Sequence, residues 1–292
     1  MWKLVVLSFL FCLTSGSFAG HEPAAVPGWN EAALTRETAG HSCLPGCQGT
    51  HTATIFHPGL PKAGQHDQVI THKGYTLSFN PVYHIANWVA YELTKWETVP
   101  SVKRNNHFVP DPLMPPGSLS NADYQGSGYD RGHLAPAADM CYSRQTMQES
   151  FYLSNISPQE PGFNRGIWAR LETLVRQWAC EDGAVYVVTG TVLSRGLPTI
   201  GRDRIAVPRY FYKVILDYSG PGIKGIGFII ANEGSQQPLQ HYAVTIDSVE
   251  KVTGTDFFYQ LPDDQQRMVE STIDLSKWRW KATGTGGSQV KN

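Results

Sequence analysis

Short apolar runs bounded by glycine and polar residues recur along the chain, and such runs are typical of β-strands. Residues 69–70 and 75–79 predict a hairpin, with its turn at Lys73 and Gly74. Three compact apolar runs follow later in the chain, at residues 184–189, 210–216 and 225–231. Residues 87–93 fit either a strand or a short amphipathic segment. Together these runs predict a largely antiparallel sheet.

Two segments carry apolar residues at helical spacing instead. In the first, apolar positions recur every three or four residues from Phe163 to Trp178. The second covers residues 244–252 and is stopped by Gly254. Residues 104–127 contain many prolines and glycines and predict a loop. We therefore expect one α+β domain, with helices on the faces of the sheet.

The two ends of the chain do not share this pattern. An early Lys3, the apolar run at residues 4–13 and small residues up to Ala19 form the layout of a secretory signal peptide. No later apolar run is long enough for a transmembrane helix, so we expect an extracellular or periplasmic protein without a membrane partner. The chain thus divides into a signal peptide (residues 1–19), an N-terminal arm (20–40), a folded domain (41–280) and a flexible tail (281–292).

Charge and cysteine content narrow the possible partners and the environment. The formal net charge is −1, and loss of Lys3 makes it −2, so affinity for a polyanion must come from a local cluster or a metal ion. Four cysteines remain after the leader, an even number that suggests disulfides in an exported chain. Cys43 with Cys47 and Cys141 with Cys180 is the pairing we expect, and a zinc site is the alternative.

Three motifs carry candidate chemistry: Asp-Arg-Gly-His at residues 130–133, Asn-Ile-Ser-Pro-Gln at 155–159, and the segment that starts at Asn164. Hydrolysis of a phosphodiester near neutral pH needs a base, and histidine titrates in that range. It also needs positive charge near the phosphate, from arginine or from a hard cation. Mg²⁺ prefers oxygen ligands and keeps several waters, so one carboxamide oxygen can be enough.

These requirements single out His133 as general base, Arg104 and Arg131 as phosphate contacts, and Asn164 as a neutral oxygen ligand. Each motif alone has a plainer interpretation, because the histidine can belong to a simple turn and Asn164 can cap a helix. The functional interpretation therefore depends on the whole set occurring together and in order.

The ordered set resembles the DNA/RNA non-specific endonucleases, which are ββα-metal (His-Me finger) nucleases. The resemblance runs from about Cys43 to about Asp264. Besides the three motifs it includes Ala-Asn-Trp-Val-Ala-Tyr at residues 86–91, Ala-Asp-Tyr at 122–124, Tyr-Leu-Ser before the second motif, Trp-Ala-Arg-Leu-Glu at 168–172 and Leu-Pro-Asp-Asp at 261–264.

The resemblance implies the ββα-metal nuclease fold, with a central, largely antiparallel sheet and flanking helices. It implies cleavage of internal phosphodiester bonds in DNA and RNA to 5′-phosphate ends, with His133 as base and Mg²⁺ on Asn164, Mn²⁺ being a substitute. An ideal helix puts Glu172 about 12 Å along from Asn164, so we expect it to hold waters around the ion. Asn155 would orient the base or the phosphate, and Asp130 would hold the backbone of its motif.

Further expectations concern the substrate and the assembly. DNA and RNA are the expected partners, and a homodimer is possible because some members of the family dimerise. The alternatives are a catalytically inactive nucleic-acid-binding protein on the same fold and a phosphodiesterase for small nucleotides. The presence of the base and of the metal ligand argues against the inactive protein. A positive groove for the polyanion would be widened by Arg202, Arg204, Arg209 and Lys213.

Overall fold

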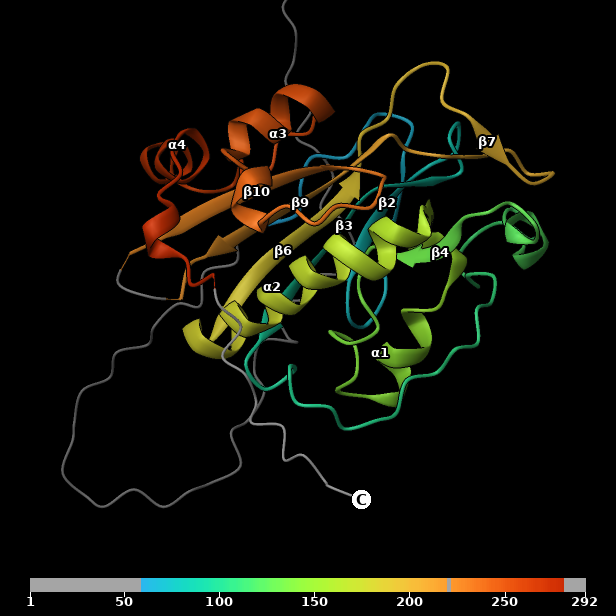
Figure 1. Ribbon diagram of the computed structural model, residues 1–292, viewed down its shortest axis with the longest axis horizontal. Coiled ribbons are helices and arrows are strands. Elements are labelled where there is room, and N and C mark those ends of the chain that lie inside the picture. Colours follow the sequence, from blue (N-terminus) through green and yellow to red (C-terminus); the bar gives the residue numbers. More distant parts are fainter. Residues whose placement is uncertain (1–58, 220–221, 281–292) are drawn as a thin grey trace, which may run out of the picture. The chain divides into compact units, whose positions relative to one another are not determined.

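The computed structural model describes residues 59–219 and 222–280, so the signal peptide, the N-terminal arm, the tail and the Cys43–Cys47 pairing lie outside the described residues. Seven strands form the central antiparallel sheet, in the order β1-β2-β3-β6-β9-β10-β11 (Figure 1). Their bounds are Gln68–Thr71, Thr76–Asn80, Ile85–Thr94, Ala184–Thr191, Tyr210–Asp217, Lys224–Ala231 and Ala243–Val244. The predicted α+β class and largely antiparallel sheet are confirmed.

Residues 87–93, which the sequence left as either a strand or a short amphipathic segment, lie in strand β3. Val89 and Tyr91 face one apolar cluster, while Trp88 and Ala90 face another on the opposite side of the sheet. A strand that is buried on both faces shows no alternation of polar and apolar residues, so its pattern does not distinguish it from a buried helix.

Helices cover both faces of this sheet. Helix α2 (Ala169–Asp182) lies across one face, and α3 (Ile246–Thr253) with α4 (Asp263–Ser271) packs on the other (Figure 1). Alternate residues of β9 pack on opposite faces of the sheet: Phe211 belongs to the apolar core under α2, and Tyr212 belongs to the core under α3 and α4. No helix in the described ranges has the length and apolarity needed to cross a membrane.

The helix predicted at residues 244–252 begins two residues later than its apolar pattern. Thr245 is the N-cap, and its side chain accepts a hydrogen bond from the backbone N of Ser248. Gly254 ends the helix with a φ of 71°, a left-handed conformation that favours glycine. The stop signal read from the sequence is therefore confirmed.

A two-stranded ribbon, β4 (Asp130–His133) with β5 (Ile156–Gln159), is separate from the main sheet. A short helix, α1 (Arg144–Glu149), and two tight turns, η2 (Asn121–Tyr124) and η3 (Leu153–Asn155), accompany it. The small strands β7 (Thr199–Ile200) and β8 (Ile205–Ala206) form a second ribbon, and η5 (Leu239–Tyr242) and η6 (Leu275–Lys277) complete the elements. The motif Asp-Arg-Gly-His is thus one strand of a ribbon.

The predicted Cys141–Cys180 disulfide is wrong, because both residues are free thiols. Cys141 is buried beside Met147 and Phe151, and its Sγ donates a hydrogen bond of 2.9 Å to the carbonyl of Ala138. Cys180 lies on the exposed side of α2. Helix α2 therefore directs the Cys180 side chain to solvent, whereas the Cys141 thiol lies in the interior.

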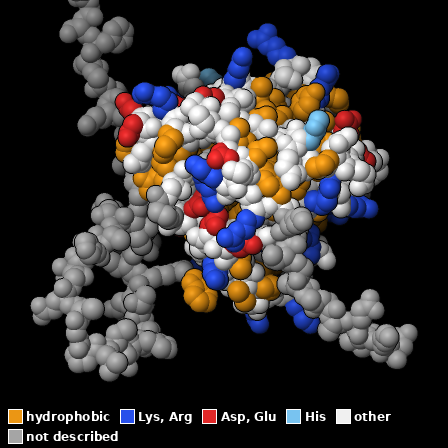
Figure 2. Space-filling model, turned by 60° about the vertical axis from the view of Figure 1, so that its left-hand side comes forward, with side chains coloured by type: hydrophobic (Ala, Val, Ile, Leu, Met, Phe, Trp, Pro, Cys, Tyr) orange, Lys and Arg blue, Asp and Glu red, His pale blue; other side chains and the backbone are white. Residues whose placement is uncertain are grey.

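Positive and negative side chains are mixed on the face of the protein drawn in Figure 2. On the face shown in Figure 2, Lys and Arg side chains are interspersed with acidic and apolar ones, without a continuous basic area. This agrees with the formal net charge of −1. A polyanion would therefore have to be attracted by particular residues at a site.

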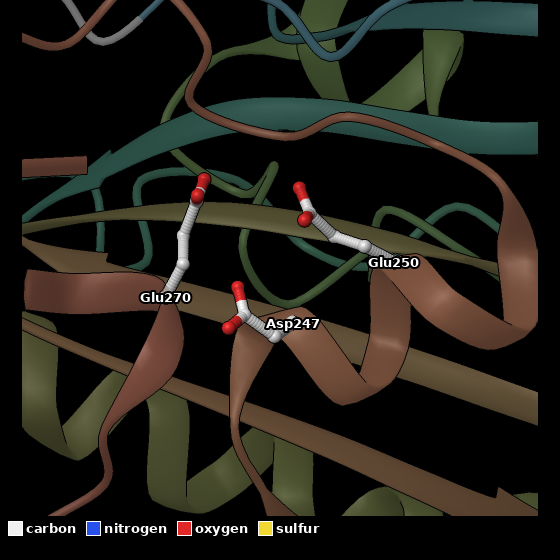
Figure 3. Close-up of side chains that lie close together, drawn as sticks. All are labelled: Asp247, Glu250 and Glu270. Atoms are coloured by element: carbon white, nitrogen blue, oxygen red, sulfur yellow. The ribbon is translucent and has the colours of Figure 1, made fainter. Parts of the chain in front are cut away.

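Three carboxylates meet where α3 and α4 pack together, and they belong to Asp247, Glu250 and Glu270 (Figure 3). Their closest oxygen atoms all lie within 4.8 Å of one another. Burial raises the pKa of Glu270 to about 8, and the charges of Glu250 and Asp247 add to the effect. The cluster lies on the α3–α4 side of the sheet, away from α2 and the Asp-Arg-Gly-His ribbon.

We expect Glu270→Gln to stabilise the protein at alkaline pH. A raised pKa in the folded state contributes stability below the unfolded value, near pH 4.5, and this stability is lost as the pH rises through about 8. A neutral glutamine escapes this loss, so the variant should raise the Tm by roughly 5 °C at pH 8.5 and by much less at pH 5. Thermal unfolding followed by circular dichroism at both pH values measures the difference.

The matched control is Asp264→Asn, which removes an exposed carboxylate from the same helix. Its effect on the Tm should be small at both pH values, because this carboxylate is exposed. An equal gain for Glu270→Gln at pH 5 and pH 8.5 would contradict the raised pKa.

Candidate active site

His133 is the last residue of β4, and its pairing with Ile156 of β5 fixes its position. The chain turns immediately afterwards. The backbone N of Leu134 donates to the carbonyl of Asn155 (3.0 Å), and the backbone N of Ala135 donates to its Oδ1 (2.8 Å). The two residues that follow His133 are therefore held in place by hydrogen bonds to Asn155.

Asn155 is fully buried and directs its whole amide group at the backbone. Its Nδ2 donates to the carbonyls of Ala135 (2.9 Å) and Ser150 (2.8 Å), while its Oδ1 accepts from Ala135. These bonds leave no amide donor for a phosphate. Of the two roles the sequence suggests, the geometry favours orienting the base.

The imidazole of His133 lies in an aromatic pocket. Its ring centroid is 4.7 Å from that of Phe151 and 5.5 Å from that of Phe108, and the residue is 8% exposed. Within the described part of the chain its Nε2 has no hydrogen-bond partner. Burial lowers the pKa of His133 to about 3, and the positive charge of Arg104 contributes. The ring is consequently neutral at physiological pH, with one nitrogen free to accept a proton.

Two arginines lie against the same phenylalanines. The guanidinium of Arg104 is 5.1 Å from the centroid of the Phe151 ring, and that of Arg131 is 4.4 Å from the centroid of Phe108. Arg104 donates a hydrogen bond from Nε to Oδ1 of Asn106 (2.8 Å), and Arg131 donates one from Nη1 to Oδ1 of Asn121 (3.0 Å). Each phenylalanine therefore contacts the histidine and an arginine, which brings two of the predicted phosphate contacts to His133.

Asn164 is tied to the same ribbon by its side chain. Its Nδ2 donates a hydrogen bond of 2.9 Å to Oδ2 of Asp130, which also binds the guanidinium of Arg165. The bond fixes the orientation of the amide and leaves its Oδ1 without a hydrogen bond to any residue in the described ranges. Asp130 therefore does more than hold the backbone of its motif, because it orients the predicted metal ligand.

The helix that carries Asn164 starts differently from the ideal one. Gly162 is the N-cap, so Asn164 is not the capping residue. Phe163–Trp168 (η4) forms a π-helical turn with a break at Gly166, whose φ is −107° and ψ is −106°. The separation of about 12 Å calculated for a regular helix between Asn164 and Glu172 does not apply across such a break.

Glu172 lies in the first turn of α2 and faces several charged groups. Its carboxylate has no hydrogen bond and no ion pair within 4 Å to any residue of the described chain. Burial raises its pKa to about 7, while Lys213, Arg176 and Arg104 oppose the rise and Asp139 adds to it. The carboxylate is thus titratable near neutral pH and makes no hydrogen bond or ion pair with the described residues.

The structure adds two residues that the sequence analysis missed. Arg176 follows Glu172 by four residues on α2, and it forms an ion pair of 2.8 Å with Asp139, whose other oxygen accepts from the Tyr91 hydroxyl. The four-residue spacing of Glu172 and Arg176 was a signal that could have identified the arginine. Asp139 could not be found in this way, because it lies in a loop.

The predicted positive groove is wrong for one of its four residues. Arg202, Arg204 and Arg209 are exposed, as a groove requires. Lys213 is only 1% exposed, because its position on β9 faces the interior beneath α2. Its charge therefore acts inside the protein.

The chain belongs to the DNA/RNA non-specific endonuclease family, which it matches over residues 51–264. The mitochondrial nuclease EXOG of Danio rerio is 34% identical over 240 residues, covering 75% of this chain and 69% of the relative. The nuclease of Serratia marcescens is 33% identical over 223 residues, covering 73% and 83%. Mitochondrial endonuclease G of Bos taurus is 31% identical over 276 residues, covering 83% and 90%.

A solved structure supports the same assignment. The EndoG chain in a crystal structure of the EndoG/EndoGI complex matches with a TM-score of 0.65 and 32% sequence identity, covering 72% of this chain and 90% of that chain. The predicted family and the ββα-metal nuclease fold are thereby confirmed, and the protein is a nuclease by family.

We expect Asp130→Asn to lower nuclease activity about 10- to 100-fold and to raise the Mg²⁺ concentration needed for half-maximal activity. A neutral amide at position 130 cannot accept the hydrogen bonds from Asn164 and Arg165 as the carboxylate does. The Asn164 amide therefore loses its fixed orientation. Plasmid cleavage measured over a range of Mg²⁺ concentrations gives both quantities.

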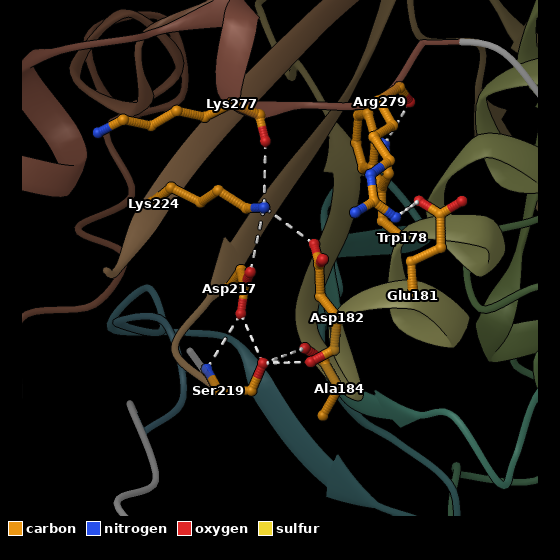
Figure 4. Close-up of polar contacts among 9 residues, drawn as sticks. All are labelled: Trp178, Glu181, Asp182, Ala184, Asp217, Ser219, Lys224, Lys277 and Arg279. Carbon is orange, nitrogen blue, oxygen red and sulfur yellow. Dashed lines mark hydrogen bonds and ion pairs between the residues drawn. The ribbon is translucent and has the colours of Figure 1, made fainter. Parts of the chain in front are cut away.

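The control is Asp182→Asn, which breaks a similar pair at the other end of α2, 2.9 Å from Lys224 (Figure 4). It should lower the Tm without changing the Mg²⁺ requirement. A folded Asp130→Asn variant with wild-type Mg²⁺ dependence would rule out the positioning role.

Proposed function

We propose that this protein is an endonuclease that hydrolyses internal phosphodiester bonds of DNA and RNA to 5′-phosphate ends, with Mg²⁺ as cofactor and Mn²⁺ as a substitute. One observation carries the proposal. The neutral imidazole of His133 lies in an aromatic pocket whose walls also hold two arginines. A phosphodiester needs this combination of a proton acceptor and positive charge.

The imidazole of His133 takes a proton from the water molecule that attacks phosphorus. The water oxygen forms a bond to phosphorus, the bond from phosphorus to the 3′ oxygen breaks, and the 3′ oxygen leaves with a proton from solvent. Arg104 and Arg131 stabilise the negative charge that develops on the phosphate oxygens. Asn155 acts on the reaction through the backbone, by holding the segment after His133 in place.

Part of the lowering of the His133 pKa, besides that due to burial, comes from the positive charge of Arg104, which a bound substrate would offset. Burial and the charge of Arg104 lower this pKa to about 3, which makes the free enzyme's imidazole a weak base. A phosphodiester anion beside Arg104 offsets that charge and raises the pKa toward the working pH. The base then becomes effective when a substrate is bound.

The available atoms fit a hard divalent cation. Asn164 Oδ1 and the Glu172 carboxylate are oxygen groups without hydrogen-bond partners among the described residues, and Mg²⁺ prefers such ligands. Asn164 would bind the ion directly, and Glu172 would accept hydrogen bonds from its waters. When bound, the ion supplies positive charge to the phosphate.

Cleavage should depend little on nucleotide sequence. Arginines and a cation contact the phosphate backbone, which carries no sequence information. We also propose export by the leader at residues 1–19, although relatives such as EXOG and endonuclease G are named as mitochondrial. A homodimer, as in some relatives, would be detected by light scattering of the mature chain.

His133→Ala should reduce the rate of plasmid cleavage by 10²- to 10⁴-fold, because the proton acceptor is lost. Circular dichroism should show a folded protein. His241→Ala, at an exposed position, is the control and should cleave at the wild-type rate. Near-normal cleavage by the folded His133→Ala variant would exclude this base. Circular single- and double-stranded DNA and RNA distinguish an endonuclease from a small-nucleotide phosphodiesterase or an inactive binding protein.

Asn164→Ala should abolish Mg²⁺ binding measured by calorimetry, and EDTA should abolish cleavage by the wild type. Glu270→Gln is the control that separates the two oxygen-rich sites, since it changes only the acidic cluster on the far face. Retained Mg²⁺ binding in Asn164→Ala, together with its loss in Glu270→Gln, would place the ion elsewhere.

A further inference from the structure

Lys213 is a buried cation that the proposed reaction does not yet use. It lies on β9 with its side chain beneath α2, on the same face of the sheet as Phe211 and Ile215. It is 1% exposed and is among the largest fully buried side chains of the described residues, together with several tryptophans and phenylalanines. An ammonium group in such surroundings needs a compensating partner.

The direct contacts of the ammonium group are neutral. Its Nζ donates to the hydroxyl of Thr189, its cross-strand neighbour on β6, and lies 5.0 Å from the centroid of the Trp168 ring. A hydroxyl and an aromatic face stabilise a cation but carry no net negative charge. The compensating charge must come from a carboxylate close by.

Two carboxylates are near enough to interact with Lys213, those of Glu172 and Asp139. Asp139 is already committed, because its two oxygens bind Arg176 (2.8 Å) and the hydroxyl of Tyr91 (2.7 Å). Glu172 makes no hydrogen bond or ion pair with any residue that the structure describes. It is therefore the anion that the lysine can balance.

The helix places Glu172 suitably for this pairing. Trp168, Glu172 and Arg176 follow one another at intervals of four residues, so they lie along one side of the helix. Lys213 is beneath the first of them, at Trp168. The Glu172 carboxylate, one turn further on, is therefore on the side of α2 that faces Lys213, close enough for the two charges to interact.

We propose that Lys213 is a positioning residue for the nuclease site, because its buried ammonium holds the Glu172 carboxylate as an anion available to a hydrated cation. This inference rests on the proposed function of Glu172 as the group that binds the waters of the ion. A neutral residue at position 213 would leave the carboxylate in a poorly solvated place without its main counter-charge, and Glu172 would take up a proton more readily.

The electrostatics of the site agree with this geometry. Burial lowers the pKa of Lys213 to about 8, and Glu172 is the strongest influence that opposes the fall. Lys213 is likewise the strongest influence that keeps the pKa of Glu172 from rising above about 7. Arg176 and Arg104 act on Glu172 in the same direction as Lys213, and Asp139 acts against them.

The first test is the Mg²⁺ affinity of Lys213→Met, measured by calorimetry at pH 7 and pH 9. The variant should bind Mg²⁺ about tenfold more weakly at pH 7, and the deficit should shrink at pH 9, where Glu172 ionises without help. Cleavage should lose kcat in the same pH-dependent way. Wild-type affinity at pH 7 in the folded variant would overturn the proposal.

Lys224→Met is the matched control. Lys224 binds Asp182 (2.9 Å), Asp217 (3.2 Å) and the carbonyl of Lys277 (Figure 4). Asp182 is the last residue of α2, whereas Glu172 lies in its first turn, so these contacts are far from the site. Loss of Lys224 should lower the Tm while Mg²⁺ binding stays unchanged at both pH values. A merely structural role for Lys213 would give this same result for Lys213→Met.

A second measurement decides the question if Lys213→Met does not fold. In metal-free protein, the ¹³Cε signal of Lys213 is titrated by NMR in the wild type and in Glu172→Gln. Glutamine removes the negative charge that raises the Lys213 pKa, so this pKa should fall below its wild-type value. An unchanged lysine titration would overturn the proposal.

The two tests also separate this inference from the proposed function. Wild-type protein that cleaves neither DNA nor RNA would end the proposed function, while the lysine titration would still report the pairing with Glu172. A wild type that cleaves both substrates and shows no change in the Glu172→Gln titration would end this inference alone.

Discussion

The hydrogen bond from the Asn164 amide to the Asp130 carboxylate joins the two halves of the site. Asp130 begins β4 and His133 ends it, so a single four-residue strand, paired with β5, carries both the proposed base and the anchor of the proposed metal ligand. The bond uses the amide nitrogen and thereby decides which atom of Asn164 faces the substrate. Arg165 of the same π-helical turn also binds Asp130, so two side chains of this turn are tied to the strand that carries the base.

Burial shifts the pKa values of His133 and Glu172 in opposite directions. It keeps His133 neutral, since an imidazolium beside Arg104 in an aromatic pocket is unfavourable. At Glu172 the same desolvation favours the protonated form, and the buried cations around it oppose that tendency. Arg104 contributes at both places. Its charge disfavours the protonated forms of His133 and Glu172 alike, which links the base and the carboxylate without a direct contact.

The sequence predicted what depends on local pattern and on family motifs. The largely antiparallel sheet, the long helix, the stop at Gly254 and the nuclease family could all be predicted in this way. It could not predict features set by contacts between distant segments. A lysine on a strand reads as a surface cation, yet Lys213 faces inward because α2 covers that face. Cys141 and Cys180 read as a pair, although the fold directs one inward and one to solvent.

The central claim is that a base at His133 and a cation on Asn164 act on the same phosphorus atom. The most direct measurement is a crystal structure of the protein with Mg²⁺ and a non-hydrolysable phosphodiester analogue. The account predicts the ion on Asn164 Oδ1 and the phosphorus between that ion and the imidazole of His133, with the arginines on the phosphate oxygens. An ion bound at the carboxylates of α3 and α4, or a phosphate out of reach of His133, would contradict it.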